Sequence, residues 1–358
     1  MNGSLLLVYE PEAACLARLL AAGIAEKHAL EISSYLAQST DLAPEFPAIS
    51  EACSARGLEF VPVPLDGAPQ ALAGCDRERA LVWTLTDGIA YFRGSTGPAL
   101  ARLHGLKTVG ADDSAFALCQ DKFRSGAVLA ALGLPIPAAA LARDGILLSA
   151  PPTAADGYFV KPNRLGSKVG IWPQSRCRTL DEALALSRRI FAAYRDDALV
   201  QAYVAGRNAR ASFLAVEPGA GLDALGVAFV DSGSDFQTMA DSLALYGETG
   251  ARTAAEGRYA EPELVGVAEA QPAAAAEIRR VAEGLMRGLG LRDVFSMDLR
   301  VAADDTVSII EFEVCPGLPC FDFRAYCRSR WRMSLAAAIA ATAANRFPPR
   351  QHRRAPDL

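Results

Sequence analysis

The stretch VFSMDLRVAADDTVSIIEFEVCPG, residues 294–317, decides the fold, because its pattern predicts two strands joined by a short polar turn. Alternate residues of a strand share a face, so Asp298 on the first strand and Glu311 and Glu313 on the second can point to one side. Apolar residues lie between them. Three carboxylates on a buried hairpin need a counter-charge, and Mg²⁺, which prefers oxygen ligands and shares them with phosphates, would supply it. The alternative is a solvated outer face of an edge hairpin.

A second pattern, VKPNRLGSKVG at residues 160–170, places Lys161 at the end of a predicted strand and before a glycine-containing turn. Backbone N–H groups in such a turn can hold phosphate oxygens, and the lysine supplies positive charge. The turn is not a Walker A loop, because the GxxxxGK[ST] spacing is absent. Taken alone, the stretch is equally typical of a plain β-hairpin.

Two weaker patterns accompany it. Asp121 and Lys122 lie in a predicted helix over residues 114–132, where such a pair is usually solvated surface. The apolar segment 199–204 predicts an extended chain whose backbone groups can face an adenine edge, or simply a core strand.

Composition indicates a soluble globular protein. The chain has 358 residues, of which 51% are hydrophobic and 22% charged, and its net charge of −5 argues against nucleic-acid and anionic-membrane surfaces. We expect a cytoplasmic location, since the sequence shows no secretory signal and no run of roughly 18 apolar residues. The eight cysteines include no CxxC pair and suggest reduced thiols, and three histidines are too few for a His-rich zinc site.

In this order and at these separations, the four patterns resemble the ATP-grasp superfamily, and the D-alanine–D-alanine ligases in particular, over roughly residues 105–320. The resemblance implies an α/β fold in which an amino-terminal parallel-sheet lobe (the pre-ATP-grasp lobe) precedes two α+β lobes that bind ATP. We expect the amino-terminal substrate lobe at 1–113, the central lobe at 114–205, the carboxy-terminal lobe with the metal site at 206–346 and a flexible tail at 347–358. The polar segment 231–260 would be a lid.

The resemblance also implies a role for each matching residue. Lys122 and Lys161 would bind ATP phosphates, and the family's mobile glycine loop matches residues 166–170, with Ser167 at the phosphate. The remaining ATP-binding residues implied by the match are Gly166, Lys168, the adenine-facing Gln201, Ala202, Tyr203 and Val204, and the ribose-facing Asn208. Two Mg²⁺ ions would be held by Asp298, Glu311 and Glu313.

Some positions depart from the family pattern. Glu313 stands where the family usually has asparagine, and Ser296 stands where it has the arginine that stabilises the tetrahedral oxyanion. Arg300 lies on the same predicted strand face as Asp298, so we hypothesise that it is the catalytic replacement. No lysine follows residue 168, so an arginine of the lid, Arg252 or Arg258, would replace the family's lid lysine.

The substrate-facing segments are rewritten more deeply. The amino-terminal lobe lacks an HGxxGEDG-type segment, and Leu-Pro-Cys-Phe-Asp-Phe-Arg follows Gly317. We therefore expect small-molecule carboxylate and amine substrates that are not both D-alanine, with Arg93, Asp322 and Arg324 as candidate substrate contacts. The alternatives are a diverged cell-wall dipeptide ligase and a non-catalytic nucleotide-binding protein. The resemblance further implies a homodimer.

Overall fold

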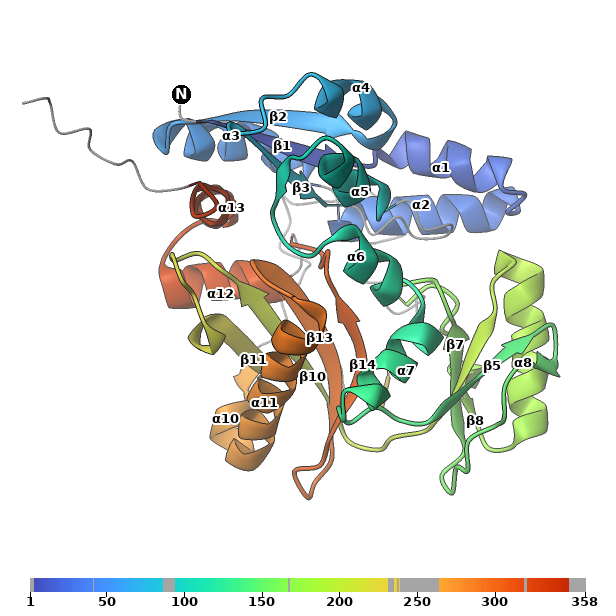
Figure 1. The fold of residues 1–358 in the computed structure, drawn as a ribbon. Coiled ribbons are helices and arrows are strands. Elements are labelled where there is room, and N and C mark those ends of the chain that lie inside the picture. The colour runs from blue at the N-terminus through green and yellow to red at the C-terminus, as the bar shows by residue number, and fades with distance from the viewer. Residues whose placement is uncertain are drawn as a thin grey trace, which may run out of the picture.

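The part of the chain that the structure describes contains three β-sheets, each formed by a different segment (Figure 1). The computed structural model describes residues 3–40, 42–85, 94–166, 168–230, 235, 236, 238, 264–318 and 321–347, apart from the side chains of residues 35–40, 321 and 322. The predicted lid, with Arg252 and Arg258, and the predicted tail therefore lie almost entirely outside the described residues.

The amino-terminal sheet is parallel, as the resemblance implies. Its strand order is β2-β1-β3-β4, with the apolar β1 in the interior of the sheet. The strands are β1 (Gly3–Tyr9), β2 (Leu58–Pro64), β3 (Ala80–Thr84) and β4 (Lys107–Thr108). The helices of this part are α1 (Glu12–Ala21), α2 (Glu26–Thr40), α3 (Phe46–Ala55), α4 (Ala68–Ala73) and α5 (Thr96–Leu103).

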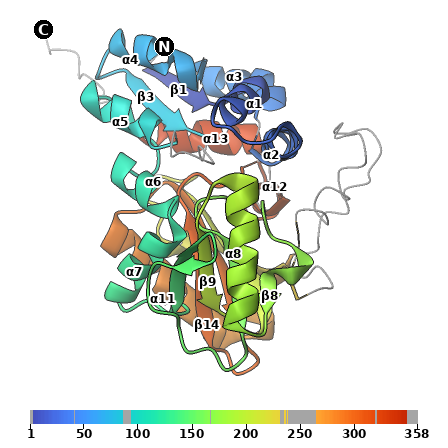
Figure 2. The ribbon, with the colours of Figure 1, turned by 90° about the vertical axis from the view of Figure 1, so that its right-hand side faces the viewer.

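The central sheet is antiparallel and has the order β6-β5-β9-β7-β8. Its strands are β5 (Ala139–Arg143), β6 (Ile146–Leu147), β7 (Tyr158–Pro162), β8 (Arg176–Cys177) and β9 (Ala198–Ala202). Helix α8 (Leu180–Tyr194) packs against it (Figure 2), and Thr179 caps this helix by accepting from the Glu182 N–H at 3.2 Å. Residues 168–172 after the turn form no strand, and β8 is the hairpin partner of β7.

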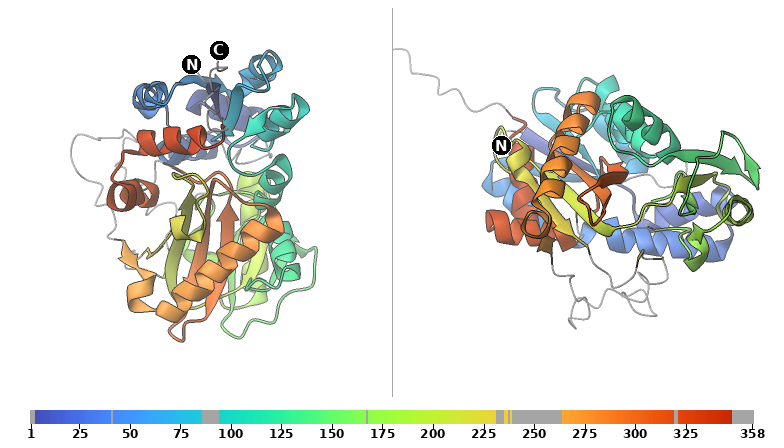
Figure 3. Two further views of the ribbon diagram at one scale, coloured as in Figure 1. Left: turned by 60° about the vertical axis from the view of Figure 1, so that its left-hand side comes forward. Right: turned by 90° about the horizontal axis from the view of Figure 1, so that it is seen from below.

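The carboxy-terminal sheet has the order β12-β11-β10-β13-β14. Its strands are β10 (Arg207–Leu214), β11 (Leu225–Phe229), β12 (Val265–Gly266), β13 (Val294–Val301) and β14 (Val307–Glu313). The predicted hairpin of residues 294–317 is confirmed as the β13–β14 pair, in which Asp298 lies opposite Glu311. Helices α10 (Val267–Ala270) and α11 (Pro272–Leu289) lie on one face of this sheet (Figure 3).

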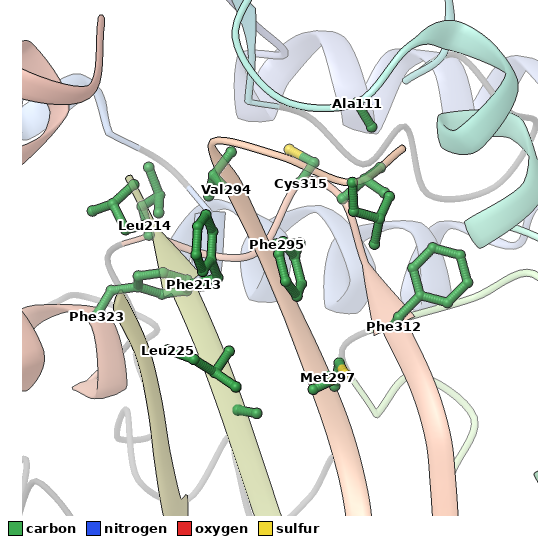
Figure 4. Packing of buried hydrophobic residues seen from close by; sticks show 14 of the residues in the cluster. Ala111, Phe213, Leu214, Leu225, Val294, Phe295, Met297, Phe312, Cys315 and Phe323 are labelled. Carbon is green, nitrogen blue, oxygen red and sulfur yellow. The ribbon is translucent and has the colours of Figure 1, made fainter. Parts of the chain in front are cut away.

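One face of the carboxy-terminal sheet is the main hydrophobic core (Figure 4). Phe213 and Phe295 stack with ring centroids 5.0 Å apart, and Met297 and Phe312 are buried beside them. Because side chains alternate along a strand, the residues between these aromatic and aliphatic groups face the opposite side of the sheet. That opposite side carries the acidic residues.

The helix predicted over residues 114–132 is in fact two helices, α6 (Asp113–Cys119) and α7 (Lys122–Ala131). Asp121 breaks it, since this residue has an extended backbone and its carboxylate accepts from the Arg124 N–H at 3.0 Å as the N-cap of α7. The break makes Lys122 the first residue of α7.

Two helices follow the carboxy-terminal sheet: α12 (Phe321–Trp331) and α13 (Leu335–Ala344). Helix α13 packs against α3 and lies below the amino-terminal sheet in the view of Figure 2. No disulfide links the cysteines that the structure describes. None of the helices in the described part of the chain is long and apolar enough to span a membrane.

Candidate active site

Glu311 lies between two lysines, one from a strand of the central sheet and one from helix α7. Its Oε2 atom is 3.3 Å from Lys122 Nζ on α7 and 3.5 Å from Lys161 Nζ on β7. The two lysine side chains are only 9% and 5% exposed, and that of Glu311 is 21% exposed. Three residues that are far apart in the sequence therefore meet at the junction of the central and carboxy-terminal sheets.

The charges of this group depend on one another. Burial alone would raise the pKa of Glu311, but Lys122 and Lys161 outweigh it and bring the pKa down to about 2. Burial also acts on the lysines: it lowers the pKa of Lys161, whereas at Lys122 the attraction of Glu311 outweighs burial and raises the pKa. Glu311 is thus an anion at neutral pH.

A buried amide holds the two lysine-bearing segments together. Asn163, fully buried in the turn after β7, accepts from the Phe123 N–H at 2.8 Å and donates to Asp121 Oδ1 at 2.9 Å. The backbone carbonyl of Asn163 accepts from the Lys122 N–H at 3.1 Å, and Lys122 Nζ donates to the Leu165 backbone carbonyl at 2.7 Å. The start of α7 is thereby fixed against the turn that follows Lys161.

The other two acids are bound by an arginine that the sequence patterns did not single out. The Arg210 guanidinium lies 3.0 Å from Asp298 Oδ1, 3.1 Å from Glu313 Oε2 and 3.1 Å from Ser296 Oγ. Burial raises the pKa of Glu313 to about 7, aided by Asp298 and opposed by Arg210, although a 34% exposed side chain weakens the effect of burial. Alternation along β10 puts Arg210 on the polar face, but nothing in the sequence tells which strand lies next to β13.

The acids suit Mg²⁺ in their chemistry, since all the donors are carboxylate oxygens. The described residues include no ready-made cluster of three acids that encloses an ion. A protein-bound Mg²⁺ usually takes one or two carboxylates and completes its shell with phosphate oxygens and water. Glu311 Oε2 is buried and faces both lysine ammonium groups, but no donor in the described part of the chain meets hydrogen-bond geometry with it, which fits such a shared site. The assignment of Asp298, Glu311 and Glu313 as metal ligands stays a prediction.

The predicted adenine-binding segment runs out of β9 towards β10. Gln201 is buried, while Ala202, Tyr203 and Val204 are partly exposed at the point where the chain leaves the central sheet. The Tyr203 N–H is bound by the Gly157 carbonyl at 3.0 Å, so this segment remains anchored beyond the end of the strand.

Arg300 points to that segment. Its guanidinium donates to the Val204 carbonyl at 3.1 Å, to Asn208 Oδ1 at 2.8 Å and to Asp235 Oδ1 at 2.6 Å. Within the described part of the chain, none of its hydrogen bonds goes to an acid of the β13–β14 pair. The contacts therefore do not favour the hypothesis that Arg300 replaces the oxyanion arginine, and they place it beside the predicted ribose-facing Asn208 instead.

The predicted glycine loop is a tight turn. The Val169 N–H donates to the Gly166 carbonyl at 3.0 Å, and Lys168 adopts a positive φ of 64°. Gly170 has φ 73°, and a Cβ there would lie 2.5 Å from the Pro162 ring. Ser167, the predicted phosphate contact, lies outside the described residues.

The predicted substrate contacts are placed unevenly. Arg93 lies outside the described residues, and Asp322 belongs to α12 but its side chain is not described. Arg324, also on α12, donates to Glu45 Oε1 at 2.8 Å, and both side chains are about a quarter exposed. This ion pair links the carboxy-terminal segment to the amino-terminal part of the chain.

The chain is similar in sequence to known ligases. No family model matches it. A D-alanine–D-alanine ligase of Frankia casuarinae is 29% identical over 224 residues, which are 62% of this chain and 54% of that ligase. A D-alanine–D-alanine ligase of an Anaeromyxobacter species is 30% identical over 223 residues, 60% of this chain and 63% of that ligase. The match thus spans less than two thirds of the length of these relatives.

The fold is similar over nearly the whole chain. A crystal structure of D-alanine–D-alanine ligase from Bacillus anthracis complexed with ATP covers 96% of this chain and 97% of its own, with a TM-score of 0.59 at 12% identity. Such low identity shows the fold alone. The predicted ATP-grasp architecture is confirmed, and the chain is similar in sequence and in fold to D-alanine–D-alanine ligases.

Proposed function

We propose that the protein is an ATP-dependent ligase that joins a carboxylate to an amine through an acyl phosphate. The observation that carries this proposal is the position of Glu311 between Lys122 and Lys161. Two buried ammonium groups facing one carboxylate across two sheets form a site for a polyphosphate anion and a divalent cation.

In the proposed reaction, Lys122 and Lys161 bind the phosphates of ATP and offset the charge that develops on the γ-phosphoryl group. The substrate carboxylate attacks the γ-phosphorus and ADP leaves. The amine then attacks the acyl carbon and releases phosphate. Mg²⁺ bound by Asp298, Glu311 and Glu313 would neutralise charge on the transferring phosphoryl group.

The substrates we propose are amino acids or metabolites derived from them. Two observations favour different substrate pairs. The relatives of similar sequence are D-alanine–D-alanine ligases, which favours a cell-wall dipeptide. The rewritten segments around Arg93 and after Gly317 favour another pair. Arg324, held by Glu45, is the described residue closest in character to a carboxylate clamp, since guanidinium binds carboxylates through two parallel hydrogen bonds.

The test is release of ADP and phosphate from MgATP over a panel of amino-acid pairs that includes D-alanine alone. We expect one pair to stimulate ADP release, and we expect Lys161→Ala to lower it at least about 100-fold. Lys27→Ala is the matched control, because Lys27 is exposed on α2 and is not one of the predicted site residues. ATP binding without turnover on any pair would instead support a non-catalytic nucleotide-binding protein, and no ATP binding at all would refute both.

A further inference from the structure

Arg210 belongs to the same row of residues as the acids. In the carboxy-terminal sheet, Arg210 on β10 lies opposite Asp298 on β13, which in turn lies opposite Glu311 on β14. Neighbouring strands are about 4.8 Å apart, so the three side chains emerge next to one another on the polar face.

The guanidinium is held in one orientation. It binds Asp298, Glu313 and Ser296 at 3.0, 3.1 and 3.1 Å, and the Arg210 side chain is only 16% exposed. Ser296 Oγ in turn donates to Glu313 Oε2 at 3.0 Å. An arginine fixed by three partners, and little exposed to water, is a preorganised positive charge that cannot be lost by deprotonation.

The guanidinium lies on the side of the acids that faces the amino-terminal lobe. Glu313 lies two residues beyond Glu311 along β14. The strand runs towards the amino-terminal lobe, because Cys315, two residues after Glu313, donates through Sγ to the Thr84 carbonyl at 3.4 Å. At the same end of the sheet Asp293, just before β13, accepts from the Gly110 N–H at 2.9 Å.

The lysine pair thus contacts Glu311, whereas Arg210 contacts Glu313, the acid nearer along β14 to the contact with the amino-terminal part of the chain. A substrate that reached from that part to a phosphoryl group held by Lys122 and Lys161 would bring its acyl carbon close to Arg210. This placement rests on the proposed ligase function.

We propose that Arg210 stabilises the negative charge on the acyl oxygen during amide formation. The amine nitrogen forms a bond to the acyl carbon, and the carbonyl electron pair moves to the oxygen, which becomes the oxyanion. The electron pair on the oxygen then re-forms the C=O bond, the bond from the acyl carbon to the phosphate oxygen breaks, and phosphate leaves with the electron pair of that broken bond. It takes up the proton lost by the nitrogen. The positive guanidinium stabilises the negative charge on this oxygen for the lifetime of the oxyanion.

The same contacts distinguish Arg210 from Arg300. Arg300 is occupied by Val204, Asn208 and Asp235 at the predicted nucleotide side. Arg210 instead donates to Asp298 and Ser296, which lie two residues apart on β13. An arginine introduced at position 296 would therefore bring its guanidinium into the volume that Arg210 now fills, provided that Arg210 is removed.

This relation gives a relocation experiment. Wild type, Arg210→Ser, Arg210→Lys and the double variant Arg210→Ser/Ser296→Arg are compared with the pair of substrates that gives ADP release. We expect Arg210→Ser to lower kcat by at least about 100-fold while KM for ATP changes less than about threefold. We expect the double variant, or guanidinium ion added to Arg210→Ser, to recover roughly tenfold of the loss.

Controls separate this role from a structural one. Arg287→Ser removes an arginine that is 80% exposed on α11 and should leave kcat unchanged. Thermal unfolding of each variant shows whether it folds. If Arg210→Ser does not fold, Arg210→Lys, which keeps a positive charge at this position, is used in its place. Turnover of a folded Arg210→Ser or Arg210→Lys variant within threefold of wild type overturns the proposal. So does a loss that neither the second arginine nor added guanidinium ion recovers. Wild type that releases no ADP with any pair refutes the proposed function itself, and this inference with it.

Discussion

Glu311 and Glu313 lie two residues apart on β14 and face the same side of the sheet, yet their pKa values move in opposite directions. That of Glu311 falls to about 2, and that of Glu313 rises to about 7. The two residues are chemically identical, and burial pushes the pKa upward in both cases.

The difference comes from the cations that each carboxylate has to itself. Glu311 faces two lysines supplied by the central part of the chain, whereas Glu313 shares the single guanidinium of Arg210 with Asp298. Position on a strand therefore does not decide the charge state of an acid. The neighbours that the fold brings to it do.

The largest expected effect is the removal of one lysine. Lys161→Ala leaves Glu311 buried with a single ammonium group, and we expect the free energy of unfolding to fall by about 3 kcal/mol in urea denaturation. Adding Glu311→Gln to this variant should destabilise it further, because Lys122 is then buried without the carboxylate that faces it. A double variant as stable as wild type would show that the charges of Glu311 and the two lysines do not depend on one another.

A smaller loss of stability is expected when the hydrogen bonds of Asn163, which fix the two lysine-bearing segments to each other, are removed. Asn163→Ala leaves the Phe123 N–H and the Asp121 carboxylate without their buried partner, which should lower the free energy of unfolding by about 2 kcal/mol. Because the start of α7 is then less well fixed, ATP affinity measured by calorimetry should fall as well. Asn345→Ala, which cuts an amide bonded to the Ala215 and Val216 carbonyls away from the lysines, is the control and should leave ATP affinity unchanged.

The opposite pKa shifts predict opposite pH dependences in metal-free protein. Folded Glu313 keeps a proton between pH 4.5 and about 7 that the unfolded chain has released, so its contribution to stability falls as the pH rises through this window. We expect about 1 kcal/mol, reduced because a third of the side chain is exposed. Glu311 stabilises the fold above pH 4.5, and this contribution is lost as the pH falls towards about 2. Denaturation of Glu313→Gln across pH 4.5–7 should show a flatter profile than wild type.

The smallest effect is expected for an ion pair outside the cluster. Arg324→Ala removes the link to Glu45, but both groups are about a quarter exposed, so stability should change by less than about 1 kcal/mol. A change as large as that of Lys161→Ala would mean that charge alone, without burial, explains the difference between the two glutamates. The same variant should raise KM for the carboxylate substrate if Arg324 is the clamp.

Part of the site was visible in the sequence alone. Alternation along residues 294–317 determined that Asp298, Glu311 and Glu313 share a face, because the period of a strand is a local property of the chain. The lysine at the end of β7 is a local signal of the same kind, and the structure has the strand where it was predicted.

The rest was decided by the tertiary structure. The pairing of β10 with β13 brings Arg210 to the acids and leaves Arg300 beside Asn208, and no local pattern reports which strands become neighbours. The break between α6 and α7 has the same origin, since Asp121 is fixed as an N-cap by the buried Asn163, 42 residues away in the sequence. Periodicity tells which way a side chain points, but only the packing of distant segments tells what it meets, and the charge of Glu311 and Glu313 depends on what they meet.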